Sequence, residues 1–424
     1  MKQFLLFIHC FLFLSLFIYA DDDVKAPEMN SEHKEESFPE DIKKTFNIKK
    51  RVIEFGFLNF GLGFSNSLLS AGEAFTDTMV IDTNKLKEGF RINFDAVVTP
   101  FFLDIDYHGK WGLRFSTETA VMGAVNLSGN LLSLGETSDD RLDISAAAFS
   151  EARLSGFFHA GKIKLKIKPA VYYPLVYVKP YISYTFTNTD NGASSDTVLN
   201  LGADMRVYTA VPINDFSGNA EFTASPGADI NLGFEYPLSE AAGLFKKFPV
   251  LNFGIGMELF NIPLVPSVMR NYMHVSARIG GDDPVDFFGG DMDMDSFLSY
   301  NAPVYGEDEQ TVFRPFKLLT WIYWKPFGEQ LLSVTPAFGF AVNPLYHRPF
   351  SPEGGVTARL NVANFFITEL GINHADRVWK NSLDIAFNTR AAEFGLGVSM
   401  QSQKFLKSWT AAGLGVNMGL KFGW

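Results

Sequence analysis

The last twelve residues of the chain, 413–424, place apolar side chains on every second position. Successive side chains of a β-strand point to opposite faces, so this segment predicts a strand with one apolar face and one small or polar face. The pattern is typical of a transmembrane barrel, whose strands turn apolar side chains to lipid and polar ones to the lumen. A strand of a soluble sandwich is the alternative. The apolar set comprises Leu414, Val416, Met418, Leu420, Phe422 and Trp424.

Similar alternation recurs along the chain. The segments 103–107 and 111–115 form a predicted hairpin around Gly109-Lys110, because a short connection between alternating strands is a hairpin signal. Nearly all charge falls on one face of these segments, whereas a soluble protein would bury some strands on both faces. We therefore predict an all-β fold, a transmembrane outer-membrane β-barrel of about 14 antiparallel strands, with 16 also compatible. Further predicted strands cover 229–236, 251–259, 332–342, 356–363, 383–388, 394–401 and 413–424.

Composition agrees with this class and limits the partners. The 424 residues suffice for two soluble domains or one large barrel, and the 43 Phe and 36 Gly suit strands with an apolar outer face and a crowded inner face. The net charge of -11 argues against nucleic acid as a partner, because a phosphate-binding surface would be basic.

The N-terminus predicts export. Residues 1–20 combine Lys2, an apolar run and Ala20 before three aspartates, as in a secretory signal peptide. An uncleaved anchor helix is the alternative, although the run is short for one. No later stretch of 18 apolar residues occurs, so the exported chain is either soluble or a barrel. Residues 21–51 are charged and read as a flexible periplasmic lead-in, with a docking tail as the alternative.

The remaining chain, 52–424, is predicted to be the barrel. Within it, residues 52–88 are open to two interpretations: a first strand followed by a long loop, or a hatch folded into the lumen. Several prolines interrupt segments whose alternation otherwise predicts strands: Pro100, Pro169, Pro174, Pro180, Pro326 and Pro336. Each marks either a strand end or a bulge, because proline cannot donate to the ladder. A kinked wall would offer a lateral path for an apolar substrate.

No enzymatic or cofactor chemistry is predicted. Cys10, the only cysteine, lies in the predicted signal peptide, which excludes disulfides, iron–sulfur clusters and a cysteine nucleophile from the mature chain. The Gly-x-Ser-x-Gly motif is absent and the seven histidines lack metal-ligand spacing. We expect no catalytic residues, no metal and no cofactor.

Four lysines are the candidate ligand residues. Lys162, Lys164, Lys166 and Lys168 alternate with Ile163, Leu165 and Ile167, so a strand places all four ammonium groups on one face. A lysine facing lipid at the midplane costs roughly 2–4 kcal/mol, so these side chains should face the lumen or lie at the membrane rim. They could attract a carboxylate there. Alternatively, lumenal acids such as Asp229, Glu235, Glu258 or Asp384 neutralise them.

The chain resembles the spirochaetal outer-membrane proteins that are similar to the FadL long-chain fatty acid transporters. The resemblance covers about the whole mature chain and rests on 55–64, the following Ser65-Asn-Ser-Leu-Leu stretch, 80–86 and the Gly/Phe-rich end. It implies a 14-stranded barrel, an N-terminal hatch and uptake of hydrophobic molecules. The Asn-Pro-Ala of the family's hatch is absent, and no binding residue is carried over.

The predicted function is a channel in the outer membrane of a diderm bacterium that passes hydrophobic or amphipathic small molecules, such as long-chain fatty acids, into the periplasm. A general diffusion porin and a structural or adhesive surface barrel are the alternatives. The expected partners are the hydrophobic ligand, outer-membrane lipid and the barrel-assembly machinery. For that machinery, Leu420, Phe422 and Trp424 form the candidate recognition signal.

Overall fold

The computed structural model describes residues 51–67, 90–127, 142–190, 195–211, 222–243, 249–279, 298–300, 303–327, 331–346, 349–389, 391–410 and 412–424. The predicted signal peptide, nearly all of the 21–51 lead-in and most of the predicted hatch lie outside these ranges. Residues 53–66, at the start of the 52–88 region, form the first strand.

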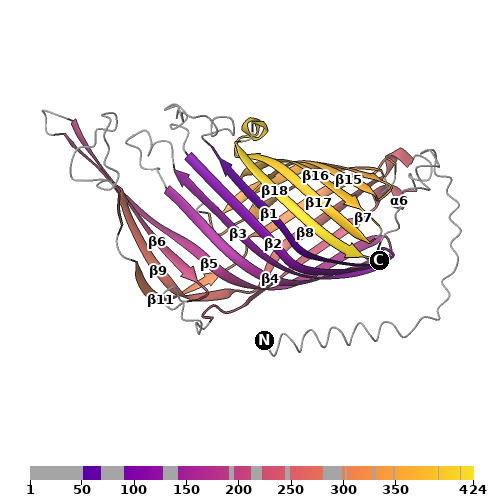
Figure 1. Cartoon of the computed structure of the whole chain (residues 1–424), viewed down its shortest axis with the longest axis horizontal. Helices are drawn as coiled ribbons and strands as arrows, with labels where there is room; N and C mark the ends of the chain where they lie inside the picture. Colours follow the sequence, from indigo (N-terminus) through magenta and orange to yellow (C-terminus); the bar gives the residue numbers. More distant parts are fainter. Residues whose placement is uncertain are drawn as a thin grey trace. The chain divides into compact units, whose positions relative to one another are not determined.

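Strands make up nearly all of the described chain (Figure 1). They are β1 (Ile53–Asn66), β2 (Phe90–Tyr107), β3 (Trp111–Leu127), β4 (Leu142–Ala160), β5 (Ile163–Asp190), β6 (Ser195–Thr209), β7 (Gly227–Tyr236), β8 (Phe253–Val265), β9 (Ser267–Ile279), β10 (Leu298–Tyr300), β11 (Val304–Val312), β12 (Phe316–Trp324), β13 (Leu332–Val342), β14 (Phe350–Val362), β15 (Phe366–Ala375), β16 (Val378–Asn388), β17 (Ala392–Ser402) and β18 (Gly413–Gly423). The short helices are α6 (Leu238–Ala241), η2 (Pro249–Leu251) and η3 (Leu406–Trp409).

The sheet closes on itself. Strand β1 pairs antiparallel with β2 on one edge and with β18 on the other, so Gly61 faces Val97 and Asn417. The closed ring runs β1-β2-β3-β4-β5-β7-β8-β12-β13-β14-β15-β16-β17-β18. This is a 14-strand antiparallel barrel, which confirms the predicted fold class. Among the described residues, no helix is long and apolar enough to span a membrane.

Three strands of the ring are broken into two segments each. The first half of β5 pairs with β7 and its second half with β6, so β6 and β7 occupy successive stretches beside one neighbour. Pro266 separates β8 from β9, and residues 313–315 separate β11 from β12. The segments β6, β9 and β11 extend one side of the wall, as Figure 1 shows at its left. We call the three breaks together the wall junction.

The two rims of the barrel differ. Tight turns at 108–110, 161–162 and 363–365 lie at the same rim as Arg51 and Trp424. We call this rim the turn end and the opposite one the loop end. In outer-membrane barrels the short turns face the periplasm.

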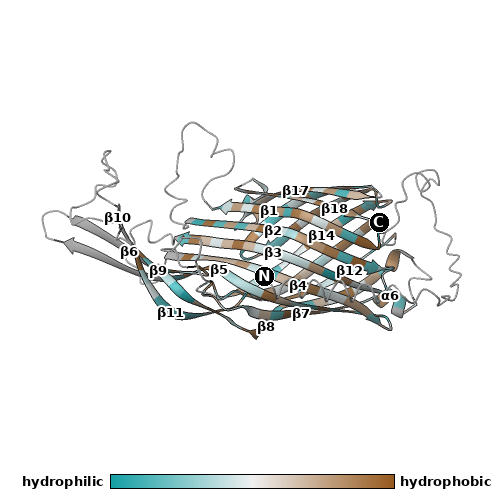
Figure 2. Ribbon diagram, turned by 60° about the horizontal axis from the view of Figure 1, so that its bottom comes forward, coloured by the Kyte–Doolittle hydropathy of each residue, from teal (hydrophilic) through white to brown (hydrophobic). Residues whose placement is uncertain are grey.

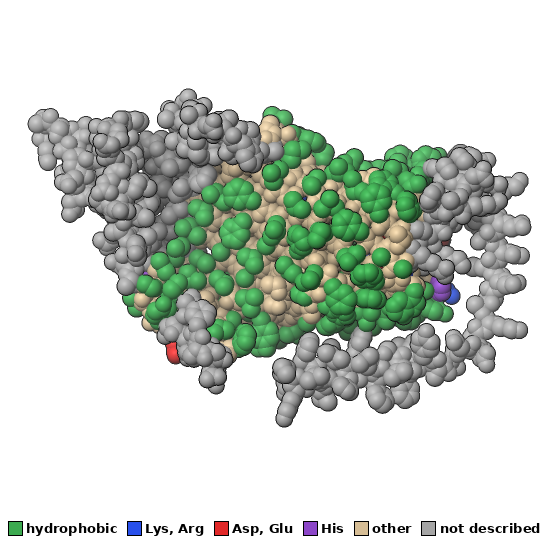
Figure 3. Space-filling view, viewed as in Figure 1, with side chains coloured by type: hydrophobic (Ala, Val, Ile, Leu, Met, Phe, Trp, Pro, Cys, Tyr) green, Lys and Arg blue, Asp and Glu red, His purple; other side chains and the backbone are tan. Residues whose placement is uncertain are grey.

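The outer surface is apolar. In Figure 2 hydrophobic and hydrophilic residues alternate along the strands, and in Figure 3 apolar side chains cover the face in view. On β18 most of the apolar side chains predicted from its alternation are exposed and Phe422 is half-buried, whereas Gly413, Gly415 and Gly423 of the other face are buried. An exterior of this kind is stable in hydrocarbon and would aggregate in water. The exposed apolar side chains are Leu414, Val416, Met418 and Leu420, together with Trp424, which follows the strand, and Asn417 on the other face is exposed as well.

Candidate functional site

The inward faces carry most of the barrel's charge, and one part of the lumen is hollow. A cavity of about 450 Å³ is lined by residues of β1, β2 and β14–β18. Its charged lining residues are Arg359, Glu369, Asp384, Glu393 and Lys421. Lys421 Nζ lies 2.9 Å from Glu393 Oε1, and Asn417 Nδ2 donates to Asp384 Oδ1 at 2.7 Å. The hollow is therefore a polar chamber with both signs of charge.

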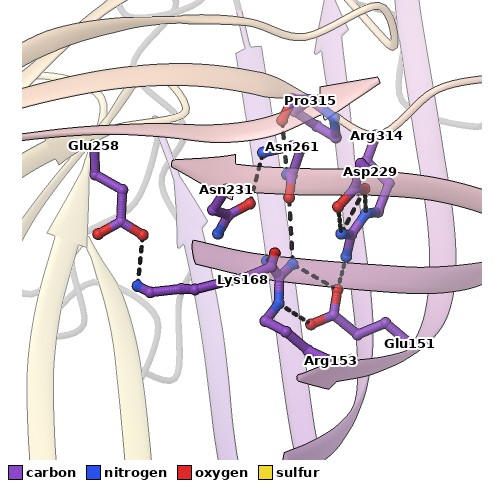
Figure 4. Close-up of polar contacts among 9 residues, drawn as sticks. All are labelled: Glu151, Arg153, Lys168, Asp229, Asn231, Glu258, Asn261, Arg314 and Pro315. Carbon is purple, nitrogen blue, oxygen red and sulfur yellow. Dashed lines mark hydrogen bonds and ion pairs between the residues drawn. The ribbon is translucent and has the colours of Figure 1, made fainter. Parts of the chain in front are cut away.

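At the wall junction, hydrogen bonds from side chains replace some of the regular backbone hydrogen bonds between strands. The backbone N–H of Asn261 donates to Asn231 Oδ1 at 2.8 Å, and Asn261 Nδ2 donates to the Pro315 carbonyl at 2.8 Å (Figure 4). Nearby, the Val268 N–H donates to Ser225 Oγ at 2.9 Å. These bonds satisfy backbone groups that the breaks would otherwise leave unpaired.

A buried ion network lies on the lumen side of the junction (Figure 4). Arg314, in the break between β11 and β12, donates Nε and Nη2 to the Asp229 carboxylate at 2.6 Å each. Arg314 also contacts Glu151, whose oxygens accept from Arg153 Nε and Nη2 at 2.9 and 3.0 Å. Because paired charges with good geometry are tolerated inside proteins, the network ties β4, β7 and the break together.

An aromatic cluster lies beside this network. Tyr172 is 1% exposed, and its hydroxyl donates to the Val312 carbonyl at 3.1 Å. Tyr177 on β5 is the direct partner of Tyr208 on β6, which in turn pairs with Tyr272 on β9. The cluster comprises Ala147, Phe149, Tyr172, Tyr177, Tyr208, Ala210, Ala224, Met269, Val312 and Leu345, with Met122 and Tyr272 packed against it. The junction thus carries a large apolar cluster beside the ion network.

The four lysines predicted as ligand residues have different interaction partners in the structure. Lys166 Nζ lies 2.7 Å from Glu235 Oε1 and Lys168 Nζ 2.5 Å from Glu258 Oε1, so lumenal acids neutralise both. Lys164 Nζ lies 4.1 Å from the centre of the Phe157 ring. Lys162 precedes β5, in the turn, and donates to the Glu240 carbonyl at 3.3 Å. The expectation that all four share one strand face is wrong for Lys162, because the turn at 161–162 ends the alternation.

Of the four acids expected to neutralise the lysines, only Glu235 and Glu258 do so. Asp229 binds Arg314 and Asp384 accepts from Asn417. The register explains the difference. Strand β5 pairs Lys164 with Glu235 and Lys168 with Asn231, which brings acids of β7 and β8 beside the lysines. Asp384 lies on β16, on the opposite side of the barrel.

The predicted C-terminal signal residues form the seam of the barrel. The Trp424 carbonyl accepts from the Val52 N–H at 2.9 Å, and the rings of Phe55 and Phe422 stack with centroids 5.7 Å apart. Leu420 points outward. These contacts close the ring and leave the three side chains on its lipid-facing surface. Within the described ranges, no group of three or more His, Cys, Asp or Glu side chains is placed to hold a metal ion.

Comparisons with known proteins find solved structures that are similar to this chain at low sequence identity. The Ralstonia pickettii toluene transporter TbuX is 9% identical over 91% of this chain and 94% of its own, with a TM-score of 0.44. The P. putida toluene transporter TodX is 9% identical over 89% and 91%, with a TM-score of 0.47. The translocator domain of the Neisseria meningitidis autotransporter NalP is 5% identical over 91% and 93%, with a TM-score of 0.34. No protein-family model and no curated protein matches the chain.

Proposed function

We propose that the barrel is an outer-membrane channel that passes small amphipathic molecules, long-chain fatty acids among them, from the loop end to the periplasm. It would do so without covalent chemistry. The observation that carries this proposal is the position of the aromatic cluster directly beside the buried ion network on the lumen side of the wall junction. A molecule with an apolar tail and a charged head would find both surfaces within one site.

The energetics favour such a ligand over a small polar solute. Apolar surface transferred from water contributes about 25 cal/mol per Å², so an acyl chain would be held against the partly exposed edge of the cluster, at Met122 and Tyr272. A carboxylate head would be drawn to lumenal cations. We propose Lys164 for this contact, because its ammonium lies over the Phe157 ring, 4.1 Å from the ring centre, near the start of β5. Lys162 would act at the periplasmic exit.

Oleate uptake tests the proposal. The chain would be produced in a diderm host that lacks its own long-chain fatty acid channel, and cell-associated labelled oleate would be measured over time. We expect accumulation above the empty-vector level. Replacing Phe149 by Ser in the cluster should reduce it severalfold, whereas Phe338→Ser on the outer face should not, because Phe338 is 71% exposed. Oleate uptake equal to the vector control, with folded barrel in the outer membrane, would refute the proposal.

A diffusion porin is the second candidate, and the polar cavity is the observation that favours it. Carboxylates of Glu369 and Asp384 and cations of Arg359 and Lys421 line the same 450 Å³ space. Opposed charges of this kind suit hydrated solutes. Single-channel recording distinguishes the candidates: a porin gives steady ohmic conductance in planar bilayers, whereas the proposed channel takes up oleate with little ion current.

A further inference from the structure

A compact turn lies at the loop end, directly after β13. The Asn343 N–H donates to the Pro349 carbonyl at 2.8 Å, and the Tyr346 N–H donates back to the Asn343 carbonyl at 3.2 Å. The Asn343 side chain accepts from the Leu345 N–H at 3.1 Å. Asn343 and Leu345 are 1% and 5% exposed, so this turn, 343–346, is folded into the protein. We call it the mouth turn.

Leu345 joins the mouth turn to the opposite part of the wall. It belongs to the aromatic cluster, which contains Phe149 of β4 and Tyr172 of β5. In the closed ring, β7, β8 and β12 lie between β5 and β13. The contact therefore runs through the lumen and not along the wall.

Tyr346 makes a second contact across the lumen. Its ring centre lies 4.7 Å from Cζ of Arg377, in the β15–β16 turn, and 5.8 Å from Cζ of Arg91, on β2. Strands β2 and β13 are diametrically opposed, because equal numbers of strands separate them in both directions around the ring. One tyrosine ring is thus held by guanidinium groups from two sides of the mouth.

Burial keeps the Tyr346 hydroxyl in its neutral form. Burial raises the pKa of the Tyr346 hydroxyl, and Asp376 adds to that effect, while Arg91, Arg377 and Lys317 oppose it. Lys317 Nζ is itself bound by Glu353 Oε1 and Asp376 Oδ2 at 3.0 Å each. The phenol therefore stays protonated at neutral pH, and its contacts with both arginines are cation–π interactions.

We infer that Tyr346 is the selectivity-determining residue at the loop-end mouth. The mouth turn closes the axial route through the described barrel to ions and hydrophilic solutes, and the two arginines hold it closed through the ring. This inference rests on the proposed function in taking the barrel to be a membrane channel for solutes other than ions and hydrophilic molecules. It makes ion exclusion a property of one side chain.

Planar-bilayer recording on purified barrel tests the inference. We expect Tyr346→Ala to raise the mean ion conductance severalfold over the wild type, whereas Tyr346→Phe leaves it unchanged because the cation–π contact needs only the ring. Tyr305→Ala is the matched control, since Tyr305 lies on β11 and is 44% exposed. Conductance of Tyr346→Ala equal to the wild type, in protein that shows the heat-modifiable gel mobility of a folded barrel, would overturn the inference.

A second variant and a second measurement cover failure of Tyr346→Ala to fold. Arg91→Ala combined with Arg377→Ala removes both partners and should give the same rise, and an unchanged conductance would again overturn the inference. In intact outer membranes, a short bis-maleimide should join Arg91→Cys to Tyr346→Cys within one chain, with background only from Cys10. Absence of that cross-link would contradict the contact. Neither readout depends on oleate, so either can fail while uptake succeeds.

Discussion

Arg314 and Asp229 form a bidentate ion pair inside the barrel, with both N···O distances at 2.6 Å and side chains 9% and 3% exposed. Arg314 lies where β11 gives way to β12, and Asp229 lies at the start of β7. The pair therefore joins two of the breaks in the wall. A break in a membrane-spanning sheet is tolerated only where other groups satisfy its backbone and hold its ends.

Removing one partner of this pair should destabilise the barrel. For Asp229→Ala we expect a loss of about 3–5 kcal/mol, because buried Arg314 loses its bidentate partner and is left to share Glu151 with Arg153. Urea-induced unfolding in detergent micelles, followed by intrinsic fluorescence, measures the change. Asp308→Ala is the control, since its pair with Arg206 is solvent-exposed and such pairs contribute little. Equal midpoints for Asp229→Ala and the wild type would contradict the role of the network.

Gly256 should not accept a side chain. It pairs directly with Trp321, and a Cβ at Gly256 would lie 2.3 Å from the Trp321 indole. Overpacking of this kind costs about 1–3 kcal/mol or more. We expect Gly256→Val to lower the yield of refolded barrel, measured by heat-modifiable gel mobility. Gly395→Val should fold normally, because a Cβ there meets its nearest atoms at 3.9 Å.

The lysines on β5 should divide into structural and ligand-contacting residues. Lys168→Gln leaves Glu258 buried without its cation, so it should lower the urea midpoint. Lys164→Gln should reduce uptake of oleate, but not of a neutral long-chain alcohol, because only the carboxylate is attracted to an ammonium. Lys110→Gln, an exposed turn residue, is the control. Equal oleate uptake by Lys164→Gln and the wild type would remove Lys164 from the ligand site.

The last residues should matter more in cells than in the test tube. Deleting Trp424 removes the carbonyl that accepts from Val52, but leaves the β1–β18 register intact. We expect refolding into detergent to be nearly unchanged and the amount of folded barrel in the outer membrane to fall severalfold, because the predicted assembly signal is lost. Membrane fractions probed with an antibody measure this. A wild-type amount in the membrane would argue against such a signal.

Alternation along single strands sufficed to predict the barrel wall. The predicted segments at 332–342 and 413–424 agree with β13 and β18, because both have one lipid face and one lumen face throughout. Alternation does not predict strands that lack a lipid face on one side and a lumen face on the other. β11, Val304–Val312, carries a run of Glu307, Asp308 and Glu309 that no lipid-facing alternation predicts, and its exposed segment extends the wall beside β9.

The prediction that prolines mark bulges or strand ends is confirmed for some of them and wrong for others. Pro100 and Pro174 lie at register shifts of β2 and β5, as expected for residues that cannot donate to the ladder. Pro336 pairs with Val356 without a shift, so it marks neither a bulge nor a strand end.

The candidate site could not be predicted from sequence, because its members meet only across the lumen. Arg314, Glu151 and Asp229 lie on segments far apart in the chain, and each is an ordinary charged residue in its own stretch. Tyr346 sits in a short connection with no periodic signal. A sequence pattern reports which face a residue takes, whereas the partner of a lumenal side chain depends on the register of every strand between them.

The central claim is that the apolar sides of these strands contact hydrocarbon, and single-cysteine labelling along β18 tests it most directly. Cysteines placed one at a time at 414–421, in a chain whose own Cys10 is removed with the leader or replaced by Ser, would carry nitroxide labels in lipid nanodiscs. We predict collision with oxygen at 414, 416, 418 and 420 and protection from it at 415, 417, 419 and 421, which is a period of two. Uniform accessibility, or access of water-soluble nickel complexes to the even positions, would contradict the transmembrane barrel and the channel proposed from it.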